Sequence, residues 1–362
     1  MPSSNNHGSP MPFASFRRPI LAVGSDQVHS EMNHDSSTPN LDTFQRQVFT
    51  WFHDISVVDA DEFLSISWIC KLLASFTSCH DHFQAILLNN RRQLLNPPAD
   101  RLATEFFDRV IKALDIFNAT RDGIEKIRIW QKHLEIIVCA LDTRQRILGS
   151  IFSNRNRSFG RKGKDSHHHR SSGHSRSLSW SVPHNWSASK QLQLITNNLI
   201  PPRGNEIETT DGLATLFFAM SFILMFVLWI LVVAIPCQDR GVQIHFTIPR
   251  NFPWSTPFSL LHSRIMDESK KRDRRNSNGL LKEIYQIEKN VHQITTLVDS
   301  AQFPLPEEVK EEVTANGNDL SLVCEACKRE LEPLQRQLRD VFRKIMNGHT
   351  EGLEALGMAT EP

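Results

Sequence analysis

Two short groups of residues have the types and spacing that metal or redox chemistry needs. Cys324 and Cys327 form a CxxC pair, the spacing of half a zinc site or of a redox dithiol. His167–His169 place three imidazoles side by side. However, no second CxxC or HxxxH lies near the cysteines, and the histidines belong to a polar, low-complexity tract that cannot fix their geometry. We therefore predict no metal site and no cofactor.

Motifs for nucleotide binding and hydrolysis are also missing. The stretch FGRKGKDS contains a Gly-Lys pair, but Asp165 follows where a phosphate-binding loop needs Ser or Thr, and no strand precedes it. GxSxG, HExxH and GxGxxG do not occur. Without a placed nucleophile, a glycine-rich loop or a metal constellation, we predict a non-enzymatic protein with no catalytic residues and identify no small-molecule substrate.

Composition limits the remaining classes. The 362 residues carry a net charge of only +1, so any binding to nucleic acid or anionic lipid must be local. There are 22 Phe and one Tyr, which indicates aromatic mass used for packing. The six cysteines are scattered through apolar helical patterns, which predicts buried thiols in a reducing compartment. The N-terminus shows no apolar segment typical of a cleavable secretory signal.

The first half of the chain shows helical periodicity and no strand-like alternation. Asp59 and Glu62 resemble a capping box that opens the second helix, and the Asn-Pro-Pro at 96–98 stops the next one. Residues 99–152 then offer two further helices, with a break near Gly123. The predicted core faces of the first two helices are Leu41, Phe44, Val48, Trp51 and Ile55, and Leu64, Trp68, Leu72 and Phe76.

Two heptad seams follow in the last third, separated by FPLPEEV. Pro333 lies inside the second seam and predicts a kink or two abutting helices. Cys324 and Cys327 occupy core positions of that seam, which favours a structural role for both. The seams are Leu280, Ile284, Ile287, Val291, Ile294 and Val298, and Leu320, Cys324, Cys327, Leu331, Leu334, Leu338, Val341 and Ile345.

A basic segment separates the first helices from the rest. Residues 153–180 hold seven Arg or Lys against a single Asp, which is typical of a solvated linker that could also attract RNA or an acidic leaflet. The segment lacks the interleaved aromatics expected for single-stranded nucleic acid, so we predict no specific nucleic-acid partner. Ser177 and Ser179 follow Arg176 closely and are possible phosphorylation sites, which would cancel part of this charge. An unmodified spacer is the alternative.

The most apolar stretch is a predicted membrane helix at 213–235, marked by Leu213, Leu224, Trp229 and Ile235. Its 23 residues would form a helix of about 34 Å, enough to cross a hydrocarbon core of about 30 Å. A helix apolar on every side can equally be the centre of a soluble bundle. We favour a single-pass membrane helix and keep a cytosolic core helix as the alternative.

The orientation of that span follows weakly from glycosylation sequons. All three, at Asn118, Asn156 and Asn185, precede the apolar stretch, and one lies within a predicted helix. We therefore place the N-terminal side in the cytosol.

These patterns predict an all-α fold: a helical bundle with a long apolar central helix and C-terminal coiled-coil-like helices. The expected segments are 1–39, disordered; 40–152, N-terminal helical bundle; 153–180, basic linker; 181–212, Trp-containing docking segment; 213–235, apolar helix; 236–262, Pro-rich connector; 263–347, heptad-patterned helices; and 348–362, tail.

Three long stretches carry a family resemblance, in addition to the PNLDTFQRQVF start. They are DRLATEFFDRVIKALDIFNATRDGIEKIRIWQKHLEIIVCAL, RSLSWSVPHNWSASKQLQLITNNLIPPRGNE and LEPLQRQLRDVFRKIMNGHTEGLEAL, which with that start span almost everything from residue 40 to 356. In them the sequence resembles the plant BYPASS-related family, in its ROH-type branch.

The resemblance implies a non-catalytic helical regulator that binds the seventy-kilodalton exocyst subunit during polarised secretion. A membrane-resident developmental signalling regulator without exocyst contact is the alternative. No family catalytic residue exists to carry over, and the resemblance assigns no contact residues.

Overall fold

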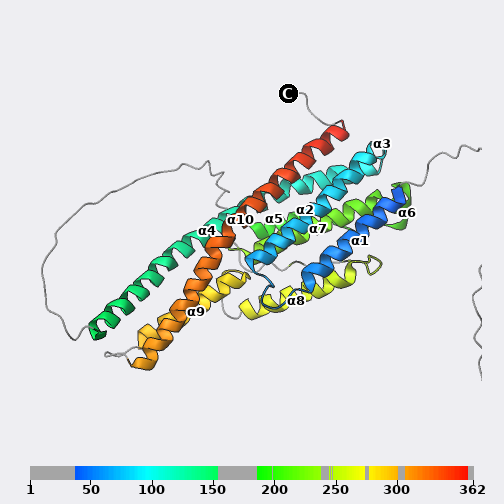
Figure 1. The fold of residues 1–362 in the computed structure, drawn as a ribbon. Coiled ribbons are helices and arrows are strands. Elements are labelled where there is room, and N and C mark those ends of the chain that lie inside the picture. The colour runs from blue at the N-terminus through cyan, green and yellow to red at the C-terminus, as the bar shows by residue number, and fades with distance from the viewer. Residues whose placement is uncertain are drawn as a thin grey trace, which may run out of the picture. The chain divides into compact units, whose positions relative to one another are not determined.

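The structure is a computed structural model and is helical throughout its regular parts (Figure 1). It describes residues 37–153, 186–197, 199–237, 244, 246, 248–273, 277–300 and 306–357. No strand occurs in these ranges, which confirms the all-α prediction. The helices are α1 (Ser37–Ser56), α2 (Ile66–Asn89), α3 (Arg91–Leu94), α4 (Ala99–Ser153), α5 (Ala188–Thr196), α6 (Gly204–Thr209), α7 (Leu213–Ala234), α8 (Ser255–Asp273), α9 (Lys282–Ser300) and α10 (Glu307–Ala355).

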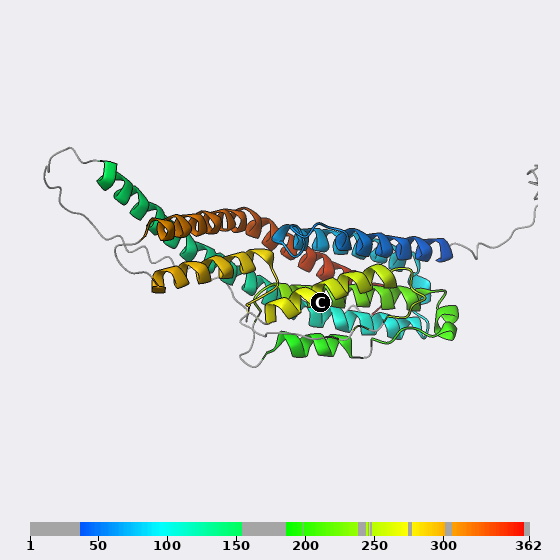
Figure 2. The same cartoon turned by 90° about the horizontal axis from the view of Figure 1, so that it is seen from below.

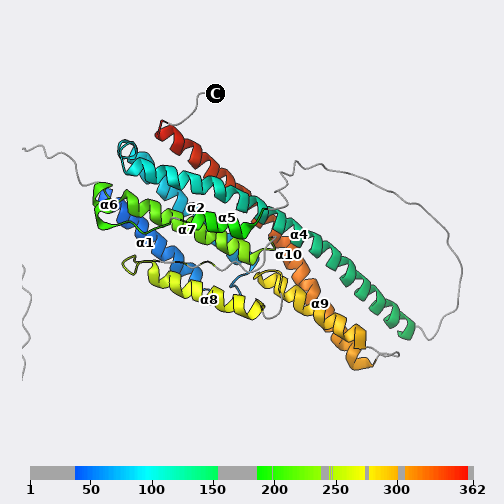
Figure 3. The same cartoon turned by 180° about the vertical axis from the view of Figure 1, so that it is seen from behind.

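The apolar helix α7 lies at the centre of the bundle formed within residues 36–362. It packs against α2, α4, α5 and α6, and all its residues except Thr215 and Val233 are buried. On a further side, aromatic rings join α1, α7 and α8: Phe226 lies 5.5 Å from Phe52 and 5.1 Å from Phe258 between ring centroids. Figures 2 and 3 show the same helices grouped around α7 from two other directions.

Helices that precede α7 in the chain pack directly on helices that follow it. In particular, α10 contacts both α2 and α4. Gln337 of α10 donates to the carbonyl of Cys70 in α2 at 2.8 Å, and Arg128 of α4 pairs with Glu332 of α10 at 3.1 Å. Among the described residues, α7 is the helix that is long enough and apolar enough to span a membrane. However, 94% of its most hydropathic window is buried by the protein itself.

The start of α2 differs from the prediction. Asp59 and Glu62 form no capping box; the chain makes turns from Asp59 to Ser65, and the Ser65 hydroxyl caps the helix by accepting from the Trp68 N–H at 3.1 Å. The reason is the backbone at Leu64, which is left-handed with φ of 60° and therefore interrupts any helix begun upstream. The Asp59 carbonyl accepts instead from the N–H groups of Glu62 and Phe63, and closes the turn.

The predicted break at Gly123 is also wrong, because α4 runs unbroken from Ala99 to Ser153. Gly123 marks a close approach between helices instead. A Cβ atom at this position would lie 2.7 Å from the Ile235 Cγ2 atom and 3.0 Å from the Pro236 carbonyl oxygen, at the end of α7. Glycine is present here because the neighbouring chain leaves no room for a side chain.

The second heptad seam is buried along its full length in α10, from Leu320 to Ile345. Pro333 lies inside this single helix, and Figures 1 and 2 show that α10 changes direction along its length. The first seam is only partly buried: Ile284 and Ile287 in α9 are covered, whereas Val291 and Val298 are 37% and 60% exposed. The side of α9 that carries Val291 and Val298 is therefore not covered by the described residues.

Three helical segments extend together beyond α7, and we call them the arm. The arm consists of residues 124–142 of α4, all of α9, and residues 307–332 of α10. Figure 3 shows α4, α9 and α10 continuing past the ends of α7 and α8. Contacts of α10 with both α4 and α9 hold the arm together.

Candidate functional site

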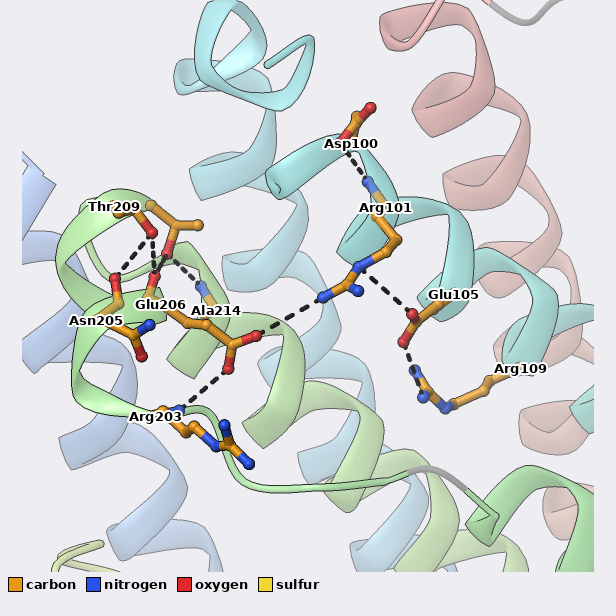
Figure 4. A network of polar contacts seen from close by, with 10 residues as sticks. Asp100, Arg101, Glu105, Arg109, Arg203, Asn205, Glu206, Thr209 and Ala214 are labelled. Atoms are coloured by element: carbon orange, nitrogen blue, oxygen red, sulfur yellow. Dashed lines mark hydrogen bonds and ion pairs between the residues drawn. The ribbon is translucent and has the colours of Figure 1, made fainter. Parts of the chain in front are cut away.

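A row of charged side chains joins the start of α4 to the short helix α6 (Figure 4). The Arg101 guanidinium lies 3.8 Å from the Glu105 carboxylate and 3.6 Å from the Glu206 carboxylate. Glu105 also pairs with Arg109 one turn further along α4, at 3.5 Å. The spacing of four residues places Arg101, Glu105 and Arg109 on one face of α4, so the row follows directly from the local sequence.

The α6 segment is fixed in place by backbone and side-chain hydrogen bonds. Glu206 accepts from the Arg203 backbone N–H at 3.1 Å. The Thr210 hydroxyl donates to the Glu206 carbonyl at 2.7 Å and accepts from the Ala214 N–H at 3.1 Å. Thr210 thus ties the end of α6 to the first turn of α7, across a sharp bend at Gly212, whose φ is 85°. This bend positions the polar row above α7.

Beside this row lies a cavity of about 510 Å³ between α4, α7 and the segment that joins α5 to α6. This volume falls within the range typical of small-molecule sites. The side of α7 that faces the cavity carries Ala214, Phe217, Phe218 and Ser221, which recur at helical spacing. Charged residues of α4, an exposed Arg203, the end of α5 and residues 199–202 form the rest of the boundary. The cavity therefore combines an apolar wall with a charged one.

The most enclosed charge at this cavity belongs to Arg109, whose side chain is 11% exposed. Burial lowers the pKa of the Arg109 guanidinium, and the nearby carboxylates of Glu105 and Asp108 partly restore it. The starting value of 12.5 is high enough that Arg109 stays charged at neutral pH. The structure therefore keeps a positive charge at the inner side of the cavity.

The arm presents a second candidate surface, which is apolar. Exposed aliphatic side chains stand on α4 and α10: Ile136 is 68% exposed, Ile137 44% and Leu322 70%. A smaller hollow of about 250 Å³ lies between α4 and α9, and it is lined by Trp130, His133, Leu134, Asn278, Ile284, Ile287, Glu288 and Val291. Exposed apolar side chains beside a hollow of this kind are typical of surfaces that accept a partner helix.

The membrane-helix residues singled out in the sequence lie together along one helix. Leu213, Leu224 and Trp229 belong to α7 and Ile235 is its C-cap, and none is more than 4% exposed. The Trp229 ring lies tilted against Phe226 and edge-to-face against Phe246. These residues form part of the buried core of the bundle.

The CxxC cysteines lie in the buried seam of α10. Burial raises the pKa of Cys324 to about 11 and that of Cys327 to about 12, and nearby carboxylates add to both shifts. Both side chains are therefore thiols at neutral pH, the form that is a poor nucleophile and a poor metal ligand. No metal-binding group of three or more His, Cys, Asp or Glu occurs among the described residues.

Several predicted positions lie outside the described residues. These are Ser177, Ser179, His167–His169, and the sequons at Asn156 and Asn185. The third sequon residue, Asn118, lies in the middle of α4. Nearly all of the basic linker and most of the predicted disordered N-terminal segment are likewise outside the described part of the chain.

The cavity itself was missed by sequence reasoning. Its charged residues come from a stretch of α4 that reads as an ordinary solvated helix face, and Ser221 reads as a neutral position within an apolar run. The one local signal is IPPRGNE at 200–206, where two prolines and a glycine punctuate the chain directly before the apolar helix.

Comparison with known proteins gives one consistent family. The family model described as "Protein ROH1-like" matches residues 2–153 and 148–356. Protein ROH1D of Arabidopsis thaliana is 43% identical over 384 residues, which cover 95% of this chain and 96% of that protein. Protein ROH1A of the same plant is 31% identical over 416 residues, covering 99% and 98%. No solved structure matches.

Proposed function

The chain belongs to the plant ROH1-like, BYPASS-related family, and we propose that it acts as a non-enzymatic helical adaptor. Its partner in this proposal is the seventy-kilodalton exocyst subunit, which it binds during polarised secretion at a membrane. The thiols of Cys324 and Cys327 are buried, and most of the described charged residues form ion pairs or hydrogen bonds within the fold. Both features are compatible with binding rather than catalysis.

The observation that carries the proposal is the exposed apolar surface of the arm. Here α4 and α10 run antiparallel, because Glu135 pairs with Lys328 at 3.4 Å and Leu141 lies next to Gly317. That register brings Leu322 level with Ile137, although the two residues are far apart in the chain. Exposed aliphatic side chains at one level of two helices offer a partner helix apolar contacts on the arm.

The test is binding of the purified full chain to the purified seventy-kilodalton exocyst subunit. Ile136→Glu and Leu322→Glu place a charge on the arm at positions whose side chains are exposed, so both variants should fold. We expect both to weaken binding tenfold or more. Leu260→Glu is the matched control, because Leu260 is 64% exposed but lies on α8, outside the arm. Equal binding by all three variants and the wild type would overturn the arm as the binding surface. No binding by the wild type would overturn the exocyst proposal.

The proposal includes membrane association, by one of two routes. In the first, α7 spans the bilayer once, with the N-terminal side in the cytosol. In the second, the chain is cytosolic and reaches the membrane through its partner. The burial of α7 and the contacts of α10 with α2 and α4 support the second route, since the first requires the bundle to open.

Carbonate extraction of isolated membranes separates these routes. A partner-recruited protein is released at high pH, whereas a single-pass protein stays in the pellet. We expect release into the supernatant. Quantitative retention in the pellet, combined with protection of one flank from protease, would establish the spanning route instead.

Phosphorylation of Ser177 and Ser179 is a further element of the proposal. Phosphates on these residues would cancel part of the positive charge of the linker and so reduce its attraction to an acidic leaflet. Phosphopeptide mapping of protein isolated from plant tissue tests this. Absence of phosphate at both positions would rule out this part of the proposal.

A further inference from the structure

The cavity beside α7 contains a buried hydroxyl without a hydrogen-bond partner. Ser221 is 1% exposed and lines the cavity, and its Oγ atom neither donates nor accepts within the structure. Leaving a buried hydroxyl unpaired costs about 1–3 kcal/mol, so such groups call for an explanation. A ligand in the cavity would supply the missing partner.

The register of α4 and α7 places this hydroxyl level with an arginine. Gly123 of α4 lies against Ile235 at the end of α7, while Arg101 reaches Glu206 just before α7 begins, so the two helices run in the same direction. Ser221 precedes Ile235 by as many residues as Arg109 precedes Gly123. Because both helices rise about 1.5 Å per residue, Ser221 and Arg109 stand at the same height on opposite walls.

The charges that line the cavity favour an anion. Four cationic residues line it, Arg101, Arg109, Lys112 and Arg203, against three carboxylates, Glu105, Asp108 and Glu206. Arg101 and Arg109 are the partners of Glu105, and Arg101 also holds Glu206 (Figure 4). Lys112 and Arg203 pair with no carboxylate in the described part of the chain, and Asp108 makes no ion pair there either, so the lining keeps a surplus of one positive charge. Lys112 lies one turn from Arg109, on the same face of α4 as the cavity.

The opposite wall is apolar and reaches the surface. Phe217 and Phe218 of α7 cover its inner part, and Leu194 and Ile200 stand at its mouth with 53% and 74% of their surface exposed. An apolar wall with cations at one level matches a ligand that has an anionic head and a hydrocarbon body. The stretch from Arg101 to Lys112 is about 16 Å long, so an extended chain fits along it.

We propose that this cavity binds a small amphiphilic carboxylate. Its hydrocarbon body lies along Phe217 and Phe218, and its head group accepts a hydrogen bond from the Ser221 hydroxyl. Lys112 and Arg109 neutralise the charge of the head group from the α4 side. The site is separate from the arm, so the proposal stands independently of exocyst binding.

The test is calorimetric titration of the full chain with dodecanoate, below its micellar concentration. Dodecanol and dodecyltrimethylammonium carry the same hydrocarbon without the negative charge. We expect dodecanoate to bind at one site per chain, and both control compounds to bind at least tenfold more weakly. Failure of dodecanoate to bind, or equal binding of dodecanol, would overturn the proposal.

Three variants locate the site. Ser221→Ala removes a hydroxyl that has no partner, so the fold is retained, and we expect about tenfold weaker binding of dodecanoate. Lys112→Gln should weaken binding by a similar factor. Lys126→Gln is the matched control, because Lys126 is an exposed residue of the same helix outside the cavity. Binding that survives both cavity substitutions, or that Lys126→Gln weakens equally, contradicts the assignment. Thermal unfolding of each variant without ligand confirms that it folds.

Discussion

Replacing Gly123 by alanine tests whether α4 truly passes this close to the end of α7. Alanine in a helix interior is ordinarily more favourable than glycine by about 1 kcal/mol. Here the new Cβ atom would meet the Ile235 Cγ2 atom at 2.7 Å and the Pro236 carbonyl oxygen at 3.0 Å. The Pro236 contact is with backbone and is hard to relieve, so we assign it the usual cost of overpacking, about 1–3 kcal/mol.

Gly317→Ala provides the matched control. Gly317 is also inside a long helix, α10, but a Cβ atom there meets only the Leu141 Cδ1 atom at 3.6 Å, an ordinary contact. The gain in helix propensity is common to both substitutions. The difference in unfolding free energy between the two variants therefore isolates the steric cost, and we expect Gly317→Ala to be more stable by about 1–3 kcal/mol.

Urea unfolding followed by far-ultraviolet circular dichroism measures this difference, with the midpoint and slope fitted for each variant. We expect Gly123→Ala to unfold at lower urea than the wild type or close to it, and Gly317→Ala at higher urea. If both variants gain the same stability, α4 does not approach α7 as described, and the explanation for Gly123 fails.

The remaining predictions concern the core and the polar junctions. Leu224→Arg should prevent folding, since Leu224 is 1% exposed. Leu260→Arg, on the surface of α8, should leave the circular dichroism spectrum unchanged. A folded Leu224→Arg variant would contradict the central position of α7. Burial lowers the pKa of His80 to about 4, so the folded state favours the neutral ring. This stability is present above pH 6.5 and is lost as pH falls toward 4, by about 3 kcal/mol, and His80→Phe should flatten that part of the urea-midpoint profile. Thr210→Val removes the hydroxyl that donates to the Glu206 carbonyl of α6 and accepts from the Ala214 N–H of α7. It should cost about 1–3 kcal/mol in the same assay, and an unchanged midpoint would refute this role of Thr210.

Periodicity predicted the buried faces well, because burial of a helix face depends on local spacing. Phe44, Val48 and Trp51 are buried, and the seam from Leu320 to Ile345 is covered throughout. Helix boundaries were harder. The break expected at Gly123 does not exist. Glycine is needed there because a segment more than a hundred residues away in the chain packs against it, and no local pattern reveals that contact.

The candidate cavity illustrates the same limit. Arg109 and Ser221 come from helices whose sequences give no sign that they face one another. Their alignment depends on the register of α4 against α7, which the contact at Gly123 sets. The arm surface is similar, because Ile137 and Leu322 lie at one level only when α10 runs antiparallel to α4. Sequence patterns therefore predict faces, whereas the pairing of faces depends on tertiary contacts.

The sides of α7 are covered by segments made at different times on the ribosome. Phe52 of α1 is synthesised before Phe226. Trp254, which precedes α8, and Phe258 of α8 pack against Phe222 and are synthesised afterwards. At about 5–20 residues per second, the chain from Ala234 to Asp273 takes roughly 2–8 s to complete. During this interval a face of phenylalanine and tryptophan rings on a helix of membrane-spanning length is open to insertion factors and chaperones. Whether α7 enters a bilayer or the bundle then depends on two rates. One is the rate at which insertion factors or chaperones bind α7, and the other is the rate at which α8 docks on it.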